Sequence, residues 1–141
     1  MKARPVKYDY RLKLTSSVDD TVSPNIFGCK FRHIKNGFEV EYSDFNTKTR
    51  NIIRVGDGGL DGGKRAEIDR SGDYSGLIVV EPGRTTVSSY KTIYGSIDIN
   101  VMGVKVDYIL GDDTATAVIE YDFGTDDNLM HAKQMLLVER A

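Results

Sequence analysis

Apolar and polar residues alternate along most of the chain, which is the pattern of a β-strand with one buried face. Near the N-terminus the apolar side chains occupy every second position, at Val6, Tyr8, Tyr10, Leu12 and Leu14, and charged or hydroxyl side chains fill the positions between them. Because successive side chains of a strand point to opposite faces of a sheet, this segment predicts a half-buried strand.

The same period of two recurs in a series of short segments down the chain. Turn-forming pairs separate many of them, among them Asn36-Gly37 and Met102-Gly103, and the second pair is predicted to join two strands. The stretch at 16–25 is predicted to be a polar, flexible loop. Many short strands at a spacing of about ten residues predict an all-β sandwich or barrel. Strands are expected near 26–35, 38–43, 47–55, 64–71, 75–81, 84–92, 95–102, 103–110 and 114–123.

The C-terminal segment, residues 128–140, is compatible with two structures. Its residue types favour a helix, and Asp126, Asp127 or Asn128 is suited to cap one. As a strand, the same segment places Met135 and Leu137 on one face. Both structures stay open from the local sequence.

Composition places the chain among ordinary globular domains. Its 141 residues suit one domain spanning 1–141, and a net charge of −2 gives no basic field for nucleic acid. A single cysteine, Cys29, excludes an internal disulfide and is typical of a reducing compartment. The first residues lack the apolar core of a signal peptide, and no apolar run approaches the roughly 18 residues of a membrane-spanning helix. We therefore expect a cytoplasmic protein that binds neither nucleic acid nor a membrane.

Motifs for phosphate and metal binding are present only in part. The stretch GGLDGGKR at 58–65 matches a phosphate-binding loop, but Arg65 replaces the hydroxyl residue that binds magnesium, and no helix is predicted after it. As a calcium loop the same stretch lacks two of the required oxygen ligands. The two histidines and one cysteine have no clustered spacing, so neither a metal nor another cofactor is predicted.

Polar residues in the inward phase of a strand are the candidate site residues. Arg70 is in phase with two apolar neighbours, and a buried guanidinium needs a carboxylate, a carbonyl or a ligand. His33 is also in phase with apolar residues and is expected to face inward, as a hydrogen-bonded core residue or as part of a site. Several tyrosines lie on apolar faces, where the ring is buried while the hydroxyl needs a partner. These tyrosines include Tyr42, Tyr90 and Tyr121.

An ordered set of motifs occupies the second half of the chain. It comprises Arg-Ser-Gly at 70–72, a Tyr-x-Thr-x-Tyr-Gly pattern at 90–95, INVMGVKVDYIL at 99–110 and ATAVIEYDF at 115–123. This set resembles the YwiB-like family of small bacterial proteins, a domain of unknown function. The resemblance implies an antiparallel up-and-down barrel of eight to ten strands, of the calycin or lipocalin-like type, with the C-terminal segment as a strand beside the first. It implies no catalytic residues.

The leading functional hypothesis is a non-enzymatic barrel that binds a small molecule in its lumen or mouth. Arg70 is expected to pair with an anionic or carbonyl group of the ligand. Tyr90, Thr92 and Tyr94 share one face by alternation, so they complete the polar part of the predicted site.

Two other classes of function stay open. One is a protein-interaction or homodimerisation module with a filled barrel, in which an exposed basic row meets an acidic partner. The other is an enzyme of small-molecule chemistry, with His33 or Arg70 beside a carboxylate. The basic row consists of Lys7, Arg11, Lys13 and Arg32.

Overall fold

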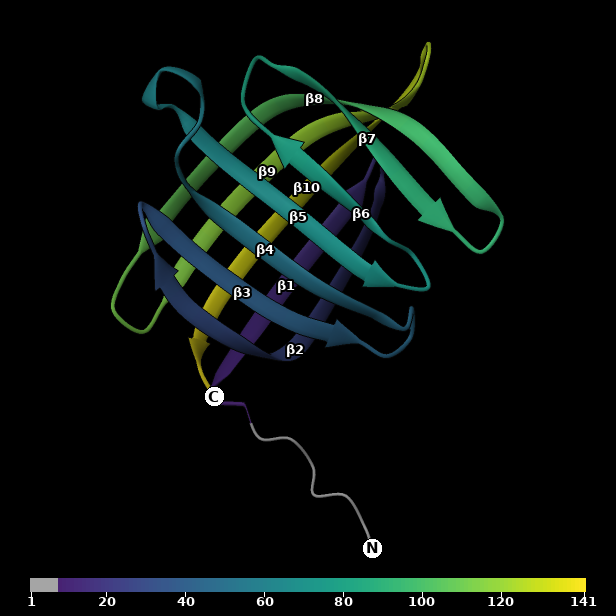
Figure 1. The fold of residues 1–141 in the computed structure, drawn as a ribbon. Helices are drawn as coiled ribbons and strands as arrows, with labels where there is room; N and C mark the ends of the chain where they lie inside the picture. The colour runs from purple at the N-terminus through teal and green to yellow at the C-terminus, as the bar shows by residue number, and fades with distance from the viewer. Residues whose placement is uncertain (1–7) are drawn as a thin grey trace, which may run out of the picture.

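Ten antiparallel strands form one coiled sheet in the computed structural model, which describes residues 8–141 (Figure 1). The sheet order is β6-β5-β4-β3-β2-β1-β10-β9-β8-β7, so strands adjacent in sequence are neighbours except at β6 and β7. The expected up-and-down barrel of eight to ten strands is therefore confirmed. The strands are β1 Tyr10–Val18, β2 Thr21–Ile34, β3 Gly37–Asp44, β4 Thr49–Asp57, β5 Lys64–Gly72, β6 Gly76–Val80, β7 Thr85–Thr92, β8 Gly95–Leu110, β9 Ala115–Thr125 and β10 Asn128–Arg140.

The C-terminal segment is a strand, as the family resemblance implies. β10 pairs with β1 along its length, and the register sets Leu14 opposite Leu136. This pairing joins the two halves of the barrel, because β1 also pairs with β2 and β10 also pairs with β9. Between residues 8 and 141 there is no α-helix, and no helix there has the length and apolar character that crossing a bilayer demands.

The seam between β6 and β7 is closed by a few hydrogen bonds instead of a full ladder. The main chains of Ser75 and Lys91 exchange two bonds, of 2.9 and 2.8 Å. The buried Ser88 hydroxyl donates to the carbonyl of Leu77 at 2.6 Å, one strand away. The barrel is thus nearly closed, with β6 and β7 as the two edge strands that meet at the seam.

The structure corrects two expectations about turns. Residues 16–25 belong mostly to β1 and β2, and the turn between these strands contains only Asp19 and Asp20. Residues 102 and 103 do not form a turn, because β8 continues from Gly95 to Leu110 with a register shift after Gly103. That irregularity is a β-bulge, which bends a strand without ending it. Val6 and Lys7 of the predicted first strand lie outside the described residues.

The two ends of the barrel differ in how they are filled. At one end, fully buried side chains from β1, β3 and β4 close the interior, among them Leu12, Phe38 and Val55. We call the other end the open end. It carries the five turns at 19–20, 45–48, 73–75, 93–94 and 126–127, which follow β1, β3, β5, β7 and β9.

Candidate functional site

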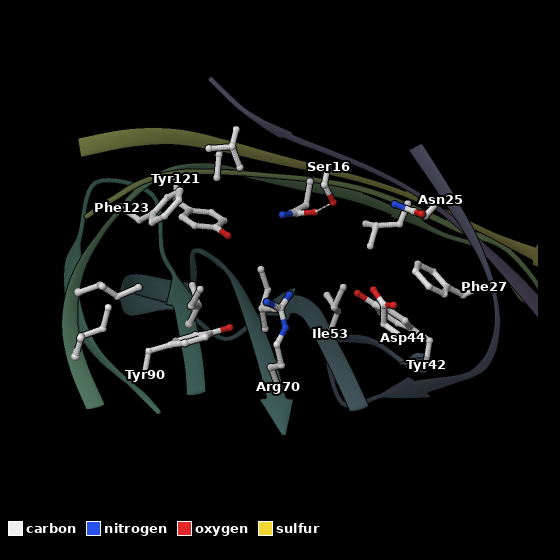
Figure 2. A pocket seen from close by; sticks show the side chains of 18 residues that line it. Ser16, Asn25, Phe27, Tyr42, Asp44, Ile53, Arg70, Tyr90, Tyr121 and Phe123 are labelled. Atoms are coloured by element: carbon white, nitrogen blue, oxygen red, sulfur yellow. Dashed lines mark hydrogen bonds between the residues drawn. The ribbon is translucent and has the colours of Figure 1, made fainter. Parts of the chain in front are cut away.

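A cavity of about 450 Å³ occupies the interior beside the open end (Figure 2). We call it the lumen cavity. It reaches solvent, because the lining residues Val18 and Ile97 are 36% and 55% exposed. The cavity has the volume of a typical small-molecule site. Its lining comprises Leu14, Ser16, Val18, Asn25, Phe27, Tyr42, Asp44, Ile53, Ile68, Arg70, Ile78, Tyr90, Ile97, Ile99, Tyr121, Phe123, Ala132 and Gln134.

The strand register arranges this lining in layers. The floor is apolar, with Ile53 opposite Ile68 and Ile68 opposite Ile78. One row nearer the open end, Asn51 lies opposite Arg70 on β4 and β5. Across the lumen, a polar pair, Ser16 and Gln134, lies one row above the apolar pair of Leu14 and Leu136. The cavity therefore has an apolar floor and a polar belt above it.

Arg70 is the cationic side chain of the belt. Its Nε donates a hydrogen bond of 2.8 Å to Oδ1 of Asn51. Asn51 is buried and is itself fixed by a bond of 3.1 Å from its Nδ2 to the Thr49 hydroxyl. No carboxylate of residues 8–141 forms an ion pair with Arg70, and its terminal nitrogens point into the lumen cavity (Figure 2). The guanidinium is thus positioned at one nitrogen and open to a ligand at the others.

Tyrosine hydroxyls complete the belt. Burial raises the pKa of Tyr42 to about 12, with the nearby Arg70 charge acting in the opposite direction. Burial likewise raises the pKa of Tyr121. Both hydroxyls therefore stay protonated at neutral pH and can donate a hydrogen bond to a ligand.

Two aromatic pairs flank Arg70. The rings of Phe27 and Tyr42 lie 4.5 Å apart between their centroids, and those of Tyr121 and Phe123 lie 5.8 Å apart. Figure 2 shows one pair on each side of the guanidinium, with Tyr90 beside it. These pairs give the cavity side walls of aromatic surface above the aliphatic floor.

Three sequence-predicted residues lie outside the lumen cavity. His33 is on the inward face of β2, opposite the buried Phe38, but it lies at the filled end of the barrel, where its ring is exposed and contacts the Asp112 carbonyl at 3.2 Å. Thr92 ends β7, where its hydroxyl bonds the main chain of Tyr94 and Gly95 at 3.1 Å each and so holds the hairpin turn. Tyr94 is 93% exposed in that turn. Arg70, Tyr42, Tyr90 and Tyr121 do line the cavity.

The sequence reasoning did not single out four polar lining residues: Ser16, Asn25, Asp44 and Gln134. Each is in phase with buried residues of its strand, so the period of two carried a signal for all four. Ser16 and Gln134 are hydrogen bonded to each other although 118 positions separate them. Asp44 accepts bonds from the main-chain nitrogens of Asn46 and Thr47, at 3.0 and 3.4 Å, and so also stabilises a turn.

The basic row that was expected to meet an acidic partner is largely neutralised within the protein. Arg11 and Lys13 approach Glu139 to 3.9 and 3.5 Å, and Arg32 approaches Glu39 to 2.6 Å. Lys7 lies outside the described residues. These contacts weaken the case for this surface as a binding site for an acidic partner.

The cysteine, the potential metal ligands and the glycine-rich stretch form no reactive or ion-binding site in the described residues. Burial raises the pKa of the Cys29 thiol to about 11, so it is protonated and poorly nucleophilic at neutral pH. Within residues 8–141, no group of three or more potential metal-ligating side chains is close enough to hold an ion. In the glycine-rich stretch, Lys64 pairs with Asp107 at 3.1 Å and Arg65 with Glu81 at 2.7 Å.

Comparisons with known proteins agree with the fold. A family model described as "Domain of unknown function (DUF1934)" matches residues 13–137. The crystal structure of the ywiB protein from Bacillus subtilis matches with a TM-score of 0.79 and 17% sequence identity, over 94% of this chain and 91% of that one. At this identity the match shows a shared fold and no more. No curated protein matches the sequence.

Proposed function

Since the chain belongs to the DUF1934 family, whose description names no activity, we propose from the geometry of the barrel that the protein binds a small molecule in the lumen cavity. The observation that carries this proposal is Arg70, a cation without an ion-pair partner among residues 8–141, inside a cavity of about 450 Å³. Keeping a guanidinium partly desolvated in the barrel interior without an ion-pair partner is costly, and an anionic or carbonyl group of a ligand offsets that cost. The protein acts as a binding protein and not as an enzyme.

The state of the single cysteine supports a protein that works in the cytoplasm. The single cysteine is buried and unpaired, which suits a reducing compartment. His33, which the enzyme hypothesis places beside a carboxylate, lies near the end of β2 that is remote from the lumen cavity and does not line it. This separation favours binding over catalysis as the role of the lumen.

Native mass spectrometry of freshly purified protein tests the proposal, together with a variant that blocks the mouth. Ile97→Trp places a large ring at the mouth, where Ile97 lines the cavity and is 55% exposed. Ile109→Trp is the matched control on the same strand, because Ile109 is 77% exposed and does not line the cavity.

We expect a bound small molecule in the wild-type protein and in Ile109→Trp, and a strongly reduced load in Ile97→Trp. Addition of the released molecule should raise the melting temperature of the wild type through mass action. Binding in the lumen would be contradicted if all three proteins carried the same load of ligand. It would also be contradicted if the wild-type protein carried no ligand and no compound of a broad metabolite screen stabilised it.

A further inference from the structure

We infer that the ligand class of the lumen cavity is an aromatic monocarboxylate, bound ring-first with its carboxylate on Arg70. The inference rests on the proposed function, because it specifies what the same cavity takes. It is carried by the charge of the belt, the depth of the floor and the aromatic side walls.

The charge of the belt favours one negative group at mid-depth. Arg70 is the cationic side chain of the lining, and its planar fork of donors matches the two oxygens of a carboxylate. The protonated hydroxyl of Tyr42 adds a donor beside it. Asp44, the acidic residue of the lining, lies at the last position of β3 and is held by the turn that follows. A doubly charged phosphate would leave one charge without a cation here.

The register limits how far the ligand extends below Arg70. The floor row of Ile53 and Ile68 lies two residues deeper than Arg70 along the strands, which is about 7 Å at 3.3 Å per residue. The next row down, Val55 and Ala66, is fully buried at 1% and 0% exposure. The apolar compartment therefore has a depth of one row, which suits a ring system and is too short for a long alkyl chain.

The side walls favour a flat aromatic body over a branched aliphatic one. The Phe27–Tyr42 and Tyr121–Phe123 pairs stand on either side of Arg70 (Figure 2). Offset or edge-on contacts between aromatic rings contribute binding free energy in addition to that from the burial of apolar area. In this pose the ring extends from the aromatic side walls down to the isoleucine floor, where it is desolvated, while the carboxylate stays at mid-depth on Arg70.

Titration calorimetry with three probes tests the ligand class: 2-naphthoate, its neutral isostere 2-naphthamide, and decanoate, whose chain exceeds one row. The variant Arg70→Gln removes the lumen cation, and Arg11→Gln makes the same change on the exterior, where Arg11 faces Glu139. Arg70→Lys retains the charge without the fork. Circular dichroism and thermal melts of each variant confirm that the comparison is between folded proteins.

We expect 2-naphthoate to bind the wild type and Arg11→Gln alike, at least tenfold more tightly than 2-naphthamide or decanoate. Arg70→Gln should lose roughly tenfold or more of the affinity for 2-naphthoate and none for the amide, with Arg70→Lys between the two. Equal affinity for acid and amide, unchanged binding by Arg70→Gln, or a preference for decanoate overturns the aromatic carboxylate while lumen binding stands. The aromatic carboxylate is also overturned, and lumen binding retained, if the protein binds no probe but native mass spectra show a different molecule bound. Failure of all probes in a protein that carries no molecule overturns both proposals.

Discussion

At the residue scale, the direction of Arg70 depends on one buried amide. Asn51 is 1% exposed, accepts the bond from Arg70 Nε and donates to the Thr49 hydroxyl. An amide suits this position because it offers an acceptor and donors from one side chain. The buried amide thus fixes Arg70 in the belt without neutralising its charge.

Asn51→Ala should therefore lower the free energy of unfolding by about 1–3 kcal/mol, because it leaves the partners of a buried amide unpaired and opens a small cavity. Urea denaturation followed by circular dichroism measures the change. Asn46→Ala is the matched control, since Asn46 is exposed in the β3–β4 turn, and it should stay within about 0.5 kcal/mol of the wild type. Equal effects of the two substitutions would show that the buried amide has no special structural role.

At the scale of elements, β8 closes the barrel against the β6–β7 connection through Gly103. Its main chain accepts a bond from Gly83 and donates one to Arg84, at 2.9 Å each. A Cβ at this position would overlap the main-chain carbonyl of Glu81. The glycine is thus required by a close approach of two main chains and not by a turn.

Gly103→Ala should destabilise the fold by about 1–3 kcal/mol, because the added methyl group forces two main chains apart. The measurement is the midpoint of urea denaturation, with hydrogen exchange of β6 and β7 amides to locate the opening at the seam. Gly58→Ala is the control, because an added Cβ there meets nothing within 4 Å. If Gly103→Ala kept the stability of the wild type, the two main chains would have to separate at this point without a cost in the free energy of unfolding.

Individual strands show which features of the fold and the site can be predicted from the sequence and which cannot. Alternation identifies the inward face, which is a local property, and it correctly placed Arg70 and Tyr42 toward the interior. It does not tell how far along a strand a cavity extends, so Tyr94 was grouped with Tyr90 although the strand ends between them. The Ser16–Gln134 pair requires the β1–β10 register, which no local pattern contains. Gly103 carries the local signal of a turn, but the contact with the β6–β7 connection decides its structure.

At the scale of the whole molecule, charges alternate across the outer face of the sheet. The register sets Arg32 opposite Glu39, Glu39 opposite Arg54, and Arg54 opposite Glu67, from β2 to β5. Such cross-strand pairs of opposite charge stabilise a sheet modestly. The charges of this row are thus paired within the sheet, while Arg70 in the lumen forms no ion pair with a carboxylate of residues 8–141.

The ion pairs of the surface predict how stability declines in acid. The hydrogen bond from Arg50 lowers the pKa of Glu41 below its ordinary value of 4.5, and the bond from Lys64 lowers the pKa of Asp107 below 3.8. A carboxylate with a lowered pKa in the folded state contributes stability above its unfolded pKa and loses it as the pH falls through the folded value. We therefore expect the free energy of unfolding to decline below about pH 4.5.

His131 predicts a second decline in the free energy of unfolding, at pH values above the stability maximum. Its hydrogen bond with Asp122, at 2.7 Å, raises the pKa of the imidazole above 6.5, with a further contribution from Glu120. A raised pKa contributes stability that is complete below the unfolded value of about 6.5 and is lost as the pH rises through the folded value. Stability is thus expected to be highest between about pH 5 and 6.5.

Urea denaturation at a series of pH values should show both declines in the wild type, and His131→Gln should remove the one above pH 6.5 while the acid limb stays. His33→Gln is the matched control, because the ring of His33 contacts a main-chain carbonyl and, unlike His131, forms no ion pair with a carboxylate of residues 8–141. It should leave both declines in place. A His131→Gln profile parallel to the wild type between pH 6 and 8 would show that the Asp122 pair adds nothing to stability.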